Sequence, residues 1–114
     1  MRKLLIAVLV TALAGVLAAS ALAAGRTVKV GDYFFVREGA ENPTVRVSKG
    51  TKVTFKWVGA SPHNVRAYKG PETFKSKTKG GDDYRFRRTF RKTGTFRLLC
   101  DIHPSSMRMT LRVK

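Results

Sequence analysis

The segment GTFRLLCDIHPSSMRMTLRV, residues 94–113, contains two stretches in which apolar side chains recur at every second position. These apolar positions are Phe96, Leu98 and Cys100 in the first stretch and Met107, Met109, Leu111 and Val113 in the second. Alternation with a period of two residues is typical of β-strands that bury one side and expose the other. The segment therefore predicts two adjacent strands joined by a short turn.

The same alternation recurs upstream. Val53, Phe55 and Trp57 share one side of an expected strand, and Val45-Arg46-Val47 alternates before it. Further along, Tyr84, Phe86 and Phe90 alternate with Arg85, Arg87 and Arg91. Residues 69–83, rich in Lys, Gly and Thr, are expected to form a long surface loop with at most one helical turn. Short strands separated by turn residues predict an all-β sandwich or barrel.

The first 23 residues differ from the rest of the chain and predict a secretory leader. Two basic residues are followed by an uncharged apolar run, Leu4 to Leu22, and Ala21-Leu22-Ala23 is a small-x-small cleavage motif. The run to Ala24 is also long enough to span a bilayer as a retained anchor. Both alternatives place the domain of residues 24–114 outside the cytoplasm, in the periplasm or the extracellular space.

Length, charge and cysteine content limit what this domain can be. The 114 residues include 23 Lys+Arg and 7 Asp+Glu, for a net charge of +16, and a single cysteine. Without the two basic residues of the leader, 21 basic and 7 acidic side chains leave +14 on the domain. A multidomain enzyme is excluded by length, and an intramolecular disulfide by the lone thiol. A bound metal is one of the few other devices that stabilise a small exported domain.

Four side chains with metal-ligand chemistry stand out in the domain. They are His63, Cys100, His103 and Met107, which include both histidines and the only cysteine of the chain. Three of them lie within eight consecutive residues, at a turn short enough to aim all three at one point. Two imidazoles, a thiolate and a thioether favour copper, and two His and one Cys with a weak axial Met is the type 1, or blue, copper arrangement. Zinc would prefer a stronger fourth ligand.

Each of these residues also has a simpler explanation. A lone histidine is common on protein surfaces, a free cysteine on the inward side of a strand is usually inert core, and Met107 and Met109 could both be core residues. Because all the histidines and the only thiol fit one template in an exported protein, we prefer the metal site.

Two segments resemble the plastocyanin/amicyanin/pseudoazurin group of cupredoxins. Trp57-Val58-Gly59-Ala60-Ser61-Pro62-His63-Asn64-Val65 is similar to the strand and loop that deliver the first His ligand in this family. Gly94-Thr95-Phe96-Arg97-Leu98-Leu99-Cys100-Asp101-Ile102-His103-Pro104 is similar to its Gly-Thr-aromatic strand leading into Cys-x-x-His. The likeness covers nearly all of residues 27–113. It implies a Greek-key β-sandwich with copper at one end, and electron carriage between larger redox proteins.

The resemblance also implies residue roles. His63, Cys100 and His103 would be the equatorial copper ligands, and Asn64 would brace the Cys100 segment by hydrogen bonds. Pro104 would stiffen the loop beside His103, whose ring edge would be the electron's exit. Met107, four residues beyond His103, is the preferred axial ligand, and Met109 is the alternative on the same side of the strand.

These observations predict an exported, monomeric blue copper protein that is an electron carrier and not an enzyme, since no histidine is left for a second, catalytic copper. The alternative function is copper sequestration or delivery with the same ligands and no redox turnover. The positive charge favours a redox partner with an acidic docking surface, or an anionic membrane or cell-wall surface. Nucleic acid is not expected as a partner, because the aromatic residues beside the arginines share the inward side of their strand.

Overall fold

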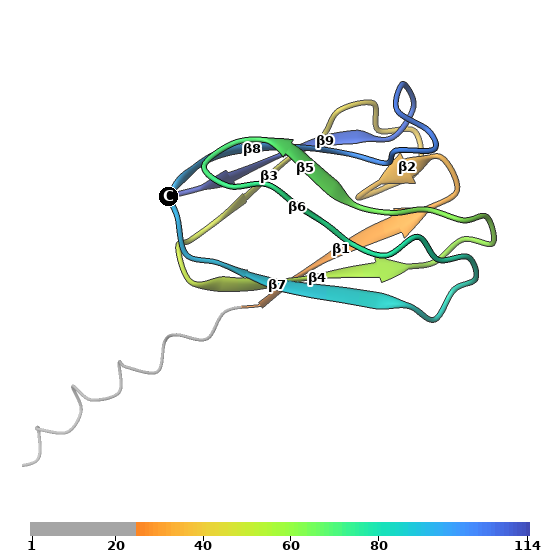
Figure 1. Cartoon of the computed structure of the whole chain (residues 1–114), viewed down its shortest axis with the longest axis horizontal. Coiled ribbons are helices and arrows are strands. Elements are labelled where there is room, and N and C mark those ends of the chain that lie inside the picture. Colours follow the sequence, from red (N-terminus) through yellow and green to blue (C-terminus); the bar gives the residue numbers. More distant parts are fainter. Residues whose placement is uncertain (1–24) are drawn as a thin grey trace, which may run out of the picture.

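The computed structural model describes residues 25–114, which form two β-sheets packed face to face (Figure 1). The strands are β1 (Gly25–Gly31), β2 (Phe34–Phe35), β3 (Thr44–Val47), β4 (Thr51–Trp57), β5 (Arg66–Lys69), β6 (Phe74–Lys75), β7 (Arg85–Phe90), β8 (Gly94–Leu99) and β9 (Arg108–Val113). One sheet has the order β2-β1-β4-β7 and the other the order β3-β9-β8-β5-β6. The predicted all-β, Greek-key sandwich is confirmed. The predicted leader lies outside the described residues.

Most neighbouring strands are antiparallel, but two pairs are parallel. These are β1 with β4, where Val30 lies opposite Trp57, and β3 with β9. Between the two strands of each parallel pair, the chain crosses to the other sheet and returns. These pairings bring turns that are distant in the sequence to the same end of the sandwich. In the described part of the chain, no helix is long and apolar enough to cross a membrane.

The alternating residues form the core, as predicted. Val53, Phe55 and Trp57 of β4 are fully buried. Phe96 and Leu98 of β8 and Cys100, which follows β8, are also fully buried, and so are the apolar residues from Met107 to Leu111. Val113 is almost fully buried. Phe90 of β7 and Phe96 of β8 meet edge to face with 5.1 Å between ring centroids, which joins the two sheets through the core.

Two sequence-based expectations need adjustment. Within the surface segment 69–83 the structure has no helical turn; instead Phe74 and Lys75 form β6, where Phe74 pairs with Ala67 of β5. Met107 lies immediately before β9, which begins at Arg108.

The aromatic residues of β7 point inward as expected, because Phe90 is buried and Phe86 packs against the core.

Candidate metal centre

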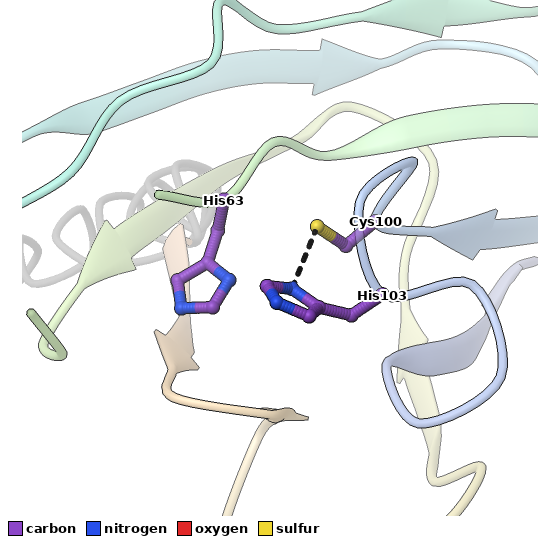
Figure 2. Close-up of side chains that lie close together, drawn as sticks. All are labelled: His63, Cys100 and His103. Atoms are coloured by element: carbon purple, nitrogen blue, oxygen red, sulfur yellow. Dashed lines mark hydrogen bonds between the residues drawn. The ribbon is translucent and has the colours of Figure 1, made fainter. Parts of the chain in front are cut away.

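Three donor side chains meet at one end of the sandwich. His63 lies in the connection between β4 and β5, and Cys100 and His103 lie in the connection between β8 and β9 (Figure 2). One ligand atom from each residue falls within 4.8 Å of the others. His63 and Cys100 are fully buried, whereas His103 is partly exposed. The structure thus brings together the three residues that the sequence singled out as equatorial ligands.

Backbone hydrogen bonds close the turn that carries Cys100, His103 and Met107. The N–H of Cys100 donates to the carbonyl of Met107 (3.1 Å), and the N–H of Met107 donates to the carbonyl of His103 (3.0 Å). The N–H of His103 donates in turn to the carbonyl of Cys100 (3.1 Å). Met107 is fully buried between these bonds, while Met109 is buried one residue pair deeper, opposite Leu98 of β8.

His63 is held by its backbone and by one ring nitrogen. Its N–H donates to the carbonyl of Lys79 (2.9 Å), and its own carbonyl accepts from the N–H of Lys79 (3.0 Å). The ring Nε2 hydrogen-bonds to Oδ1 of Asp32 at 2.9 Å. The other nitrogen, Nδ1, is buried and has no hydrogen-bond partner within residues 25–114. Since buried polar atoms are normally paired, this nitrogen is available to a ligand.

The donor set fits a soft transition metal. Nδ1 of His103 lies 3.6 Å from Sγ of Cys100, so the imidazole and the sulfur face the same point (Figure 2). Thiolate and imidazole donors select copper or zinc over magnesium or calcium. With the unpartnered Nδ1 of His63, the site offers two nitrogens and one sulfur.

Asn64 links the two ligand-bearing connections. Its backbone N–H points at Sγ of Cys100 (3.5 Å). Its side-chain amide donates to Oδ2 of Asp101 (2.9 Å) and accepts from the backbone N–H of Asp101 (2.8 Å). The bond from Asn64 lowers the pKa of Asp101, and Arg66 adds to the effect through its own hydrogen bond. The Asn64 side chain therefore fastens the segment after Cys100 to the segment after His63.

Pro104 follows His103 on the surface of the same turn. Its carbonyl accepts a hydrogen bond from Nε of Arg108 (2.7 Å), the first residue of β9. Pro104 is thus tied to the strand that leaves the turn.

Sequence reasoning missed Asp32 and Tyr33, the turn between β1 and β2. The hydrogen bond with His63, together with those from the backbone N–H groups of Ala60 and Ser61, lowers the pKa of Asp32 to about 2. Tyr33 has a φ of 73° and its ring meets that of His103 edge-on, with 4.9 Å between centroids. An aspartate and a tyrosine in a turn carry no sequence signal for either contact, which only the strand pairing creates.

The sequence of this chain matches a known protein family. A model of copper binding proteins of the plastocyanin/azurin family matches residues 39–114. No curated protein matches the chain.

Solved structures match over most of the chain. A reduced mutant of amicyanin is 25% identical with a TM-score of 0.65, over 83% of this chain and 88% of that chain. The Cu(I) form of another amicyanin mutant is 25% identical with a TM-score of 0.66, over 85% and 89%. A Cu-containing nitrite reductase from Thermus scotoductus SA-01 is 26% identical with a TM-score of 0.66, over 82% of this chain but 22% of that chain. The first two likenesses extend over nearly the whole of the amicyanin chain, whereas the third covers a small part of the nitrite reductase chain.

Proposed function

Because this chain belongs to the plastocyanin/azurin family of copper-binding proteins, we propose that it holds one copper ion in a type 1 site and carries single electrons between redox partners. His63, Cys100 and His103 would be the equatorial ligands and Met107 the axial ligand. The observation that carries the proposal is the convergence of three donor atoms within 4.8 Å, one of which belongs to a buried imidazole with a free Nδ1.

Copper, when bound, supplies a one-electron couple. The chain's own residues keep the donor atoms in place, since His63 is bonded to Lys79 through its backbone and Asn64 joins the two ligand-bearing connections. Donor atoms that are held in place by such hydrogen bonds move little when the charge at the site changes, which favours rapid electron exchange.

The electron's path to the surface would pass through His103. His63 and Cys100 are fully buried, and the ring of His103 is the partly exposed member of the set. No enzymatic activity is proposed, because both histidines and the only cysteine of the chain lie at this one site and no donor of these types remains for a second copper.

The leader and the charge suggest where the protein works. Residues 1–23 would act as a secretory leader or as a retained anchor, which places the domain of residues 24–114 in the periplasm or the extracellular space. A charge of +14 on a monomeric domain would steer it to a redox partner with an acidic docking surface, or to an anionic membrane or wall.

Electrochemistry tests electron carriage. We expect the copper-loaded protein to give a reversible one-electron wave at an electrode and to retain its copper through repeated cycles, because its donors need not rearrange. Copper content before and after cycling, measured by atomic absorption, completes the experiment. Release of copper on reduction would instead support the alternative, a protein that sequesters or delivers copper with the same ligands.

A pair of methionine variants tests the axial ligand. Met107→Leu should shift the visible spectrum and the reduction potential, because the axial thioether tunes both. Met109→Leu should leave the spectrum unchanged. Since Leu and Met have similar volumes, each variant should lower the free energy of unfolding by less than about 1.5 kcal/mol. A spectral change confined to the Met109 variant would reassign the ligand.

A further inference from the structure

The carboxylate of Asp32 is built into the site although it is not a candidate ligand. Its Oδ1 lies 2.9 Å from Nε2 of His63 and accepts a hydrogen bond from the backbone N–H of Ser61 (2.9 Å). Its Oδ2 accepts from the backbone N–H of Ala60 (3.1 Å). Two backbone N–H groups donate to the two oxygens, and an ionised carboxylate can only accept, so the proton shared with His63 belongs to Nε2 of the imidazole.

We propose that Asp32 is a positioning residue for His63, which holds the proton on Nε2, leaves Nδ1 unprotonated on the side of Cys100, and favours Cu(II) over Cu(I) at the site. The proposal rests on the proposed function, in which His63 is a copper ligand. A histidine that binds a metal through one ring nitrogen commonly donates the other N–H to a carboxylate, which fixes the ring orientation and raises the basicity of the ligand.

The fold prepares the place for this carboxylate. Val30 of β1 lies opposite Trp57 of β4 in a parallel pair, so Asp32 and Gly59, two residues beyond each, emerge side by side. A Cβ on Gly59 would lie 2.5 Å from Oδ1 and 2.7 Å from the backbone N of Asp32. Only a residue without a side chain therefore allows the Asp32 turn to approach the His63 connection this closely.

The expected electrostatic effect has a definite sign. Asp32 places a negative charge one imidazole ring away from the donor nitrogen, and that charge stabilises the more positive of two metal oxidation states more strongly. Loss of the charge should therefore weaken Cu(II) binding more than Cu(I) binding and raise the reduction potential.

Nitrogen NMR of the metal-free protein tests the tautomer without copper. In the wild type, His63 should carry its proton on Nε2. Asp32→Asn keeps an acceptor oxygen and should preserve this tautomer, whereas Asp32→Ala removes the acceptor and should give a mixture of both tautomers. A wild-type His63 protonated on Nδ1, or an Asp32→Ala variant with unchanged ring shifts, would overturn the positioning role.

Voltammetry of the copper-loaded protein tests the charge. We expect Asp32→Asn and Asp32→Ala each to reduce the preference for Cu(II) over Cu(I) by about tenfold. Tenfold is about the smallest loss of metal affinity that removal of a ligand's hydrogen-bond partner typically causes. For one electron, tenfold corresponds to a rise in potential of about 59 mV. An unchanged potential in both variants would overturn this part of the proposal.

Glu72→Gln is the matched control, because it removes one carboxylate charge at the other end of the sandwich. Glu72 pairs with Arg88 at 3.3 Å. Its neighbour Pro71 lies against Gly94, the first residue of β8, whereas Cys100 follows the last residue of that strand. The potential of the Glu72→Gln variant should match that of the wild type, since the charge of a distant, partly exposed side chain is screened. An equal rise in this control would mean that Asp32 acts only through net charge and would overturn the proposal.

The two proposals can fail separately. If the wild type takes up copper and turns blue but the Asp32 variants keep its potential and tautomer, the role of Asp32 is wrong and the copper site stands. If the tautomer responds to Asp32→Ala but the protein never becomes blue with Cu(II), the positioning of His63 stands and the proposed function fails.

Discussion

Cys100→Ser should abolish the intense visible absorption that the protein acquires with Cu(II). The band would arise from charge transfer between a thiolate and copper, and Cys100 is the only thiol of the chain. Serine has nearly the shape of cysteine, and its oxygen can still accept the backbone N–H of Asn64 that now points at Sγ. The metal-free variant should therefore stay folded, and the loss of colour would report on the sulfur alone.

The measurement is a visible spectrum of the purified protein titrated with Cu(II), accompanied by circular dichroism of the metal-free form. Ser105→Ala is the control, because Ser105 lies exposed in the same turn and offers no sulfur or imidazole. It should keep the full band. A Cys100→Ser variant with an unchanged blue band would contradict the assignment of this cysteine as a ligand, and a colourless wild type would contradict the copper site itself.

Trp57→Ala should have the largest effect on stability. The Trp57 side chain at the end of β4 is fully buried, and its ring meets that of Tyr84 edge-on with 4.7 Å between centroids. Its Nε1–H donates to the carbonyl of Lys79 (2.9 Å), the same carbonyl that accepts the N–H of His63. Removing a buried aromatic side chain typically costs about 3–5 kcal/mol. That is a large share of the roughly 5–15 kcal/mol by which a domain is stable.

Urea unfolding of the metal-free protein measures this cost. Trp57→Phe keeps most of the buried ring and loses the hydrogen bond, which is worth about 1 kcal/mol, so it should lie between the wild type and Trp57→Ala. Val58→Ala is the control, because Val58 is the next residue and is 39% exposed. It should change the free energy of unfolding by less than about 0.5 kcal/mol. A Trp57→Ala variant as stable as the Val58 control would contradict the role of Trp57 as a central core residue.

The strands and their inward faces were predictable because they follow from a local period. Val53, Phe55 and Trp57 repeat at every second residue, and the pleat of a strand sends all three to the same side whatever lies opposite. The surface segment 69–83 was less predictable. Phe74 and Lys75 pair with β5 there because a partner strand offers hydrogen bonds, which the Lys, Gly and Thr composition does not reveal.

The kinds of donor at the candidate site were also evident from the sequence, since a single thiol and two histidines leave few other arrangements. The sequence did not reveal which atom of each donor is free to bind a metal. Asp32 lies 31 residues before His63, and it reaches Nε2 only because β1 and β4 pair in parallel and carry their ends to the same side of the sandwich.

Sequence by itself therefore determined the alternating strands and the chemical identity of the donors, because both depend on residue type and short-range spacing. Only the tertiary structure decided that His63 presents Nδ1 and that Asp32 holds its other nitrogen. Both follow from the register of strands far apart in the chain, and no local pattern encodes that register.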